Sequence, residues 1–190
     1  MAFGIEDIAT QPASLRRMTK MIADGLTNPK TAPLIIRTAR KIVSDCDARD
    51  DRCEVEAIFD AVKEGTDKIP GLSKGLRYVS DPRTYDYFSS AAQTLKACQQ
   101  GSCAGDCDDA SILVSSLLLA LGFKVGVRAW GPKPGVKEYT HVYPVVAIPK
   151  NAPSYPAGYG GHGVDVTTPE SYVGWEPRKG EVLTYWIDGG

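Results

Sequence analysis

The segment GDCDD, at residues 105–109, combines residue types that can perform nucleophilic chemistry. Cys107 stands between Asp106 and Asp108, directly ahead of a strongly apolar stretch that predicts a core helix. A thiol attacks as its thiolate, and a helix N-terminus lowers the thiol pKa. Asp106 can cap such a helix, and the following aspartates suit its first turn. Because nearby carboxylates raise a thiol pKa, Cys107 needs a cationic partner.

Two histidines, His141 and His162, are the candidates for that partner. His141 falls in an alternating apolar pattern typical of a strand, which can hold an imidazole rigidly, whereas His162 lies in the glycine-rich segment GYGGHG. A lone strand histidine is more often a packed core or surface residue, and Asp165 alone would be a turn or cap residue. In chain order, however, Cys107, His141 and Asp165 match a nucleophile, a base and an orienting carboxylate. We therefore predict these three residues to be catalytic.

The five cysteines leave other interpretations open. Their odd number means that at least one is unpaired or pairs with another chain. The close pairs Cys46/Cys53 and Cys98/Cys103 could form local disulfides, but the N-terminus lacks the features of an export signal, so we expect reduced cysteines and a cytoplasmic protein. Zinc on Cys98, Cys103 and Cys107 is disfavoured because no C-x-x-C pair is present. A redox protein would instead form a reversible disulfide between Cys103 and Cys107.

Composition bounds the class of protein. The 190 residues are 43% hydrophobic and 24% charged, which is typical of a soluble globular domain. A formal net charge of −1 disfavours nucleic acid as a partner. The most apolar run, residues 111–125, contains serines, a glycine and a lysine, and falls short of the roughly 18 apolar residues of a membrane span. We expect neither nucleic acid nor a membrane as a partner.

Residues 1–76 are predicted to be a helical N-terminal extension packed on the core. Three segments separated by proline- and glycine-containing breakers each carry one apolar face. These faces consist of Leu15, Met18, Ile22 and Leu26, then of Leu34, Ile35, Ala39, Ile42 and Val43, and then of Val55, Ile58, Phe59 and Val62. The pattern leaves open whether the extension completes the core, docks a partner or covers the site.

Residues 77–190 are predicted to form an α+β core, so that the whole chain makes one folded unit. A short extended run at 77–79 precedes a central helix that begins at Cys107 and is ended by Gly122. Alternating patterns at 124–130 and 139–148 predict strands, and the segment HGVDVTT, residues 162–168, predicts a third strand that carries Asp165. Short glycine- and proline-rich connections favour an antiparallel sheet packed on the central helix.

The motifs GDCDD, LLLALGFKVGVRAWG, THVYPV and VDVTTPE resemble those of the transglutaminase-like superfamily of papain-type cysteine enzymes, over roughly residues 77–175. The resemblance implies a papain-like fold, no metal or cofactor, and a protein or peptide substrate. The longer segments RYVSDP, TLKACQQGSCAGDCDDASIL and VDVTTPESYVGWEP are similar to transglutaminase-like proteins encoded among the structural genes of tailed bacteriophages and prophages. That similarity implies the host cytoplasm or the virion as location and other phage structural proteins as partners.

Carried onto this sequence, the resemblance makes Cys107 the nucleophile, His141 the general base and acid, and Asp165 the orienting carboxylate. The expected chemistry is acyl transfer through a thioester, with a peptidase or amidase favoured over a crosslinking transglutaminase. A non-catalytic virion or assembly protein that uses the same fold for binding is the alternative. The side chain that completes an oxyanion hole is not identified by the pattern, and the candidates are Gln99, Gln100, Tyr85 and Tyr87.

Overall fold

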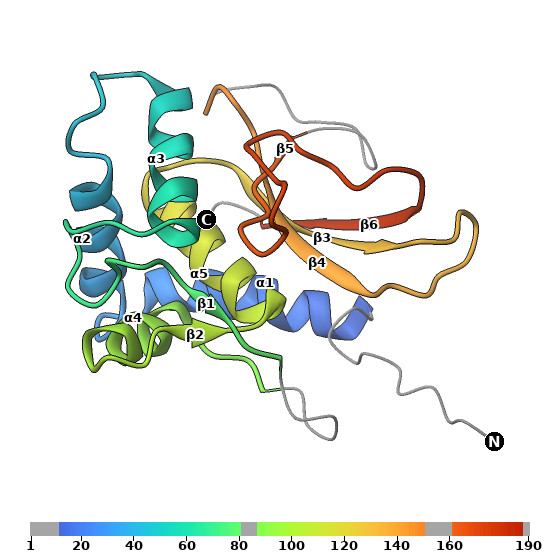
Figure 1. Ribbon diagram of the computed structural model, residues 1–190, viewed down its shortest axis with the longest axis horizontal. Coiled ribbons are helices and arrows are strands. Elements are labelled where there is room, and N and C mark those ends of the chain that lie inside the picture. Colours follow the sequence, from blue (N-terminus) through green and yellow to red (C-terminus); the bar gives the residue numbers. More distant parts are fainter. Residues whose placement is uncertain (1–11, 81–86, 151–160, 188–190) are drawn as a thin grey trace.

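The computed structural model describes residues 12–80, 87–150 and 161–187. Its helices are α1 (Pro12–Thr27), α2 (Ala32–Ile42), α3 (Asp51–Lys63), α4 (Ala91–Gln99) and α5 (Cys107–Ala120). Its strands are β1 (Arg77–Tyr78), β2 (Ala104–Gly105), β3 (Val125–Gly131), β4 (His141–Val146), β5 (His162–Gly163) and β6 (Glu181–Trp186). Helix α5 lies between the outer helices and the larger sheet (Figure 1). Within the described residues, no helix combines the length and the apolar character that a membrane span requires.

The predicted helices of the N-terminal part are confirmed, and each places its apolar face in the core. Leu15, Met18 and Ile22 of α1 are fully buried, as are the central residues of the faces predicted for α2 and α3. Asp50 begins α3 by accepting a hydrogen bond from the Cys53 N–H, 2.9 Å away. These helices pack against α5, so their apolar faces and that helix share one continuous core.

Helix α5 is the centre of that core. It begins at Cys107, as predicted, and its apolar residues from Ile112 to Leu118 are buried on every side. Gly122 follows the helix with φ +85°, a left-handed conformation that glycine adopts without steric cost. Truncating a buried leucine such as Leu113 or Leu117 to alanine would cost about 2–5 kcal/mol of stability.

The larger sheet is antiparallel with strand order β5-β4-β3-β6, which confirms the predicted α+β class with a central helix on an antiparallel sheet. Val127, Ala129 and Val142 face the core that contains α5. Arg128 and its register partner Tyr143 alternate to the opposite face. Strand β6 was not predicted, although its alternating segment EVLTYW carries the period of a strand.

Helix α4 and strand β2 were also missed by the sequence analysis. Helix α4 begins with a capping box, in which Ser90 accepts the Gln93 N–H and the Gln93 side chain accepts the Ser90 N–H. That Ser-x-x-Gln pattern was the available signal, but the helix is short and its periodicity is weak. Strand β2 pairs in parallel with β1 and leads directly into Asp106.

The third predicted strand is wrong beyond Gly163, and Asp165 lies in a turn that follows β5. The Asp165 carboxylate accepts the backbone N–H groups of Thr167 and Thr168, at 2.9 and 3.3 Å. Side-chain bonds of this kind compete with the ladder bonds of a sheet and favour a turn. The turn still places Asp165 beside β4, because β5 pairs with the end of that strand.

The expectation of reduced cysteines is wrong, because the structure contains disulfides Cys46–Cys53 and Cys98–Cys103. Each joins cysteines less than eight residues apart, with Cα atoms separated by 5.7 and 3.9 Å. The pairing excludes the proposed Cys103–Cys107 redox pair from this state, and it removes two thiolates from the zinc alternative. Disulfides are typical of oxidising compartments, so the step from a missing export signal to reduced cysteines is not supported.

The pairing predicts how many thiols can be labelled. In protein refolded in a glutathione redox buffer and then denatured without reductant, iodoacetamide should label Cys107 alone, whereas prior reduction should expose all five cysteines. Peptide mass mapping would identify the Cys46–Cys53 and Cys98–Cys103 crosslinks. A crosslink that includes Cys107, or labelling of more than one cysteine without reduction, would contradict this pairing.

Candidate active site

The helix that presents Cys107 is capped by Asp106. The Asp106 Oδ1 atom accepts the N–H groups of Asp108 and Asp109, at 3.0 and 3.1 Å, which satisfies two donors of the first turn. Cys107 is the first residue of α5, is half-buried, and belongs to neither disulfide. Its Sγ lies 3.9 Å from the Asp108 Oδ1. The predicted cap and the predicted first-turn carboxylates are therefore confirmed.

Asp109 fixes the same helix start from a second side. Its Oδ1 accepts the Ser89 N–H at 2.7 Å, which ties the segment ahead of α4 to the first turn of α5. Gly105 permits this approach, since a Cβ there would lie only 2.7 Å from the Cβ of Asp109. The aspartates around Cys107 are thus buried anchors of the helix start rather than a solvated acidic face.

His141 and Asp165, predicted from chain order alone, are in direct contact. His141 Nε2 lies 2.8 Å from Asp165 Oδ2, with Asp165 only 1% exposed and the His141 side chain 20% exposed. An ionised carboxylate only accepts hydrogen bonds, so Nε2 carries the proton when Asp165 is charged. That contact fixes the ring orientation and leaves Nδ1 as the nitrogen that would exchange a proton with another group.

The Asp165 carboxylate is held charged by its surroundings. Besides His141, it accepts the hydroxyl of Thr167 at 2.8 Å and that of Thr168 at 2.6 Å, in addition to their backbone N–H groups. Burial raises the pKa of Asp165. The hydrogen bond and the charge of His141, together with hydrogen bonds from Thr168 and Thr167, lower the pKa by more than burial raises it. The pKa falls from its usual 3.8 to about 2. Asp165 is therefore ionised throughout the neutral and mildly acidic range.

A direct contact joins the start of α5 to the start of β4. The Ser111 hydroxyl donates to the carbonyl oxygen of Val142, at 3.3 Å. Ser111 lies about one helical turn after Cys107, and Val142 immediately follows His141. The packing thus brings the two segments that carry the predicted nucleophile and base against each other. The pairing of the Cys107 thiol with His141 Nδ1 remains a prediction.

A partly buried polar network lies behind His141. The His141 ring stacks on Tyr143, with centroids 5.7 Å apart, and the Tyr143 hydroxyl donates to Glu176. Glu176 in turn forms an ion pair with Arg128 at 2.6 Å, and the Arg128 Nε donates to Thr184 at 2.8 Å. Burial, followed by the charge of Glu176, raises the pKa of Tyr143, so the phenol remains a donor.

Sequence reasoning missed this network. Tyr143 could have been found from its place two residues after His141 on the same strand face. No spacing rule links Glu176 to the strands it contacts.

Other predicted site residues are placed less centrally. His162 lies in β5 and is exposed, so it is not positioned as His141 is. Among the candidates for an oxyanion-hole side chain, Gln99 and Gln100 are exposed at the end of α4, and Tyr87 is 65% exposed. The remaining candidate, Tyr85, lies outside the described residues.

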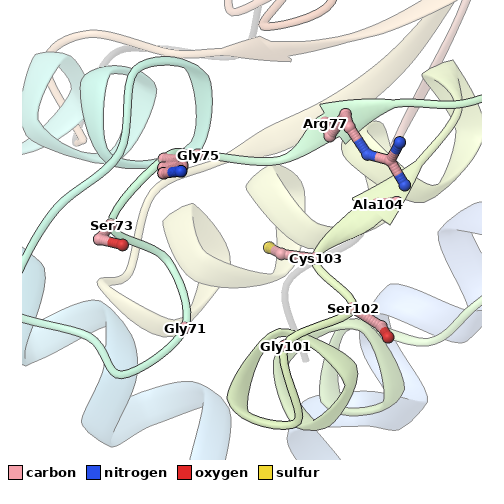
Figure 2. A pocket seen from close by; sticks show the side chains of 9 residues that line it. Gly71, Ser73, Gly75, Arg77, Gly101, Ser102, Cys103 and Ala104 are labelled. Carbon is pink, nitrogen blue, oxygen red and sulfur yellow. The ribbon is translucent and has the colours of Figure 1, made fainter.

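A pocket of about 320 Å³ lies beside β1 and β2. Figure 2 shows Ser73 and Gly75 on one side of it, and Arg77 beside Ala104 on the other. Its lining residues are Gly71, Ser73, Lys74, Gly75, Arg77, Gly101, Ser102, Cys103 and Ala104. The pocket contains no member of the predicted triad, although Ala104 is only three residues ahead of Cys107. It is therefore a neighbour of the candidate site and not the site itself.

The chain matches no family model and no curated protein. Among solved structures it is similar to LapG of Legionella pneumophila in an EGTA-treated form, with 15% identity, a TM-score of 0.45, and 84% of this chain and 73% of that chain covered. It is also similar to a provisionally assigned protease from Parabacteroides distasonis ATCC 8503, with 13% identity, a TM-score of 0.43 and 68% of this chain covered. This chain spans only 24% of the Parabacteroides protein. The assignment of the site rests on the contacts of its own residues.

The low pKa of Asp165 predicts how acid affects stability. Because the folded pKa of about 2 lies below the usual 3.8, the carboxylate contributes stability above about pH 4 that is lost as the pH falls through 2. Between about pH 4 and pH 2, the stability advantage of the wild type over Asp165→Asn should fall by about 2 kcal/mol. Urea unfolding followed by circular dichroism measures this. An advantage that stays constant down to pH 2 would contradict the low pKa.

Proposed function

We propose that this protein is a cysteine hydrolase that cleaves a peptide or carboxamide bond through a thioester. Cys107 is the nucleophile, His141 is the general base and acid, and Asp165 orients the imidazole. The contact between His141 Nε2 and the buried, ionised Asp165 is the observation that carries the proposal. A carboxylate of that kind stabilises an imidazolium and fixes its ring, which is what a thiol nucleophile needs from its partner.

In the first half of the reaction, His141 Nδ1 takes the proton of the Cys107 thiol and the thiolate sulfur attacks the carbonyl carbon. The tetrahedral intermediate collapses as His141 returns the proton to the leaving amine, so that the C–N bond breaks and a thioester remains. Asp165 keeps its charge throughout and balances the imidazolium. In the second half, His141 takes a proton from water, the hydroxide displaces the sulfur, and Cys107 regains its proton.

The start of α5 supports a role in stabilising the oxyanion. The Asp106 carboxylate accepts the N–H groups of Asp108 and Asp109, which caps the first turn of the helix at whose N-terminus Cys107 lies. A backbone N–H at the nucleophile, combined with the positive end of the helix dipole, is a suitable donor for the negative oxygen of a tetrahedral intermediate. The Cys107 N–H is therefore the proposed first donor of the oxyanion hole.

The first test measures the reactivity of Cys107. Iodoacetamide should alkylate Cys107 selectively between pH 5 and 8, because an imidazolium holds the thiolate form below the usual thiol pKa. His141→Ala should lower the alkylation rate at pH 6 by about tenfold or more, which corresponds to the loss of about 1.4 kcal/mol of thiolate stabilisation. His162→Ala is the matched control, since His162 is exposed, and it should leave the rate unchanged. Equal rates in wild type and His141→Ala would refute the proposed pair and favour a scaffold that only binds.

A second test separates hydrolysis from transamidation, because the two differ only in the nucleophile that resolves the thioester. Peptide libraries with and without glutamine would be incubated with the protein and a fluorescent primary amine, and the products analysed by mass spectrometry. We expect cleaved or deamidated products that disappear in Cys107→Ala. Incorporation of the amine without hydrolysis would make the protein a transamidase instead.

A further inference from the structure

We infer that Lys63, at the end of α3, is a positioning residue for the predicted triad, because its ammonium group holds together the turn that presents Asp165. The inference rests on the proposed function and concerns the same site. It assigns a role to the N-terminal helices, which the sequence left undetermined. Lys63 lies more than a hundred residues from the turn in sequence.

The ammonium group of Lys63 is surrounded by oxygen atoms of one short segment. Its Nζ lies 3.0 Å from the carbonyl oxygen of Thr168, 3.0 Å from that of Pro169 and 2.7 Å from that of Ser171. The Ser171 hydroxyl is also within reach, at 2.9 Å. An ammonium has three donors, so this single group satisfies backbone acceptors that no strand or helix pairs in residues 168–171.

The same segment forms the cradle of Asp165. The Thr168 hydroxyl donates to Asp165 Oδ2, which is the oxygen that contacts His141. Ser171, which is 7% exposed, donates its hydroxyl to the carbonyl oxygen of Asp165 and lies 2.7 Å from that of Thr168. Lys63 is therefore linked to the Asp165 carboxylate through Thr168, and to the Asp165 backbone carbonyl through Ser171.

The place of Lys63 in α3 explains why its ammonium group is held against the 168–171 segment. Lys63 is the last residue of α3, a helix whose apolar face is fixed in the core by Val55, Ile58 and Val62. Its ammonium also lies 5.1 Å from the centre of the Phe59 ring. Without the ammonium, the carbonyl oxygens of the turn would lose their donor, and the turn would rearrange to reach water. The Thr168 hydroxyl would then leave Asp165, and the carboxylate would no longer be held in the orientation that meets His141.

The test compares the pH dependence of Cys107 alkylation in Lys63→Met, Asp165→Asn and the wild type. We expect the apparent thiol pKa to rise in both variants, with Lys63→Met intermediate and up to about tenfold slower than wild type at pH 6, as for the loss of a charge-assisted hydrogen bond. Lys150→Met is the matched control. Lys150 also joins α3 to the second half of the chain, through Glu54 at 2.6 Å, but it contacts no residue of the 165–171 turn among those described.

Lys150→Met should lower the melting temperature without moving the alkylation profile, which separates loss of stability from loss of positioning. The double variant Lys63→Met/Asp165→Asn should have the profile of Asp165→Asn alone, because Lys63 acts through Asp165. If Lys63→Met fails to fold, Ser171→Ala breaks the same connection while keeping the ammonium on its carbonyl oxygens, and it should shift the profile in the same direction.

The outcomes distinguish this inference from the function it rests on. If Asp165→Asn and His141→Ala both leave the wild-type profile unchanged, the proposed triad is wrong and the inference falls with it. If those variants shift the profile but folded Lys63→Met and Ser171→Ala do not, the triad stands and Lys63 is only a structural contact. Additive shifts in the double variant would also overturn the inference, because they would mean that Lys63 acts independently of Asp165.

Discussion

The burial of Asp165 as an anion is the constraint on which the rest of the site depends. A charge that is 1% exposed is stable only when donors surround it, and here His141, Thr167 and Thr168 supply them. These donors outweigh the cost of burial, since the pKa falls below its usual value. The same interactions that keep the carboxylate charged also orient His141, so one arrangement serves both stability and the proposed chemistry.

Cys107, the proposed nucleophile, is positioned by different means. Cys107 is placed by a helix that is apolar on every side and by the buried carboxylates of Asp106 and Asp109, which fix the first turn. The hydrophobic core sets where the helix lies, and the cap sets where it starts. Since α1, α2 and α3 share that core, the N-terminal helices support the helix that carries Cys107 by packing, while Lys63 reaches the turn of Asp165 directly.

One of the two disulfides lies just ahead of the start of α5. Cys98–Cys103 joins the end of α4 to the segment that enters β2, and β2 leads into Asp106. The crosslink reduces the conformations open to the chain just ahead of the helix start. The Cys46–Cys53 disulfide likewise restricts the chain between α2 and α3, because it joins the connecting loop to the first turn of α3. With these pairs oxidised, Cys107 is the one cysteine of the chain that belongs to no disulfide.

The local features of this protein could be predicted from its amino-acid sequence. Apolar periodicity predicted α1, α2, α3 and α5, and the Asp-Cys pattern predicted the capped helix start, because such signals act over a few residues. Chain order also selected His141 and Asp165. The folded chain was needed to show that Asp165 lies in a turn, that Lys63 contacts this turn, that Glu176 contacts Tyr143, and which cysteines pair. Some of these contacts join residues far apart in the chain, and others depend on the exact distance between backbone atoms. Neither kind of information is contained in an apolar period or a short motif.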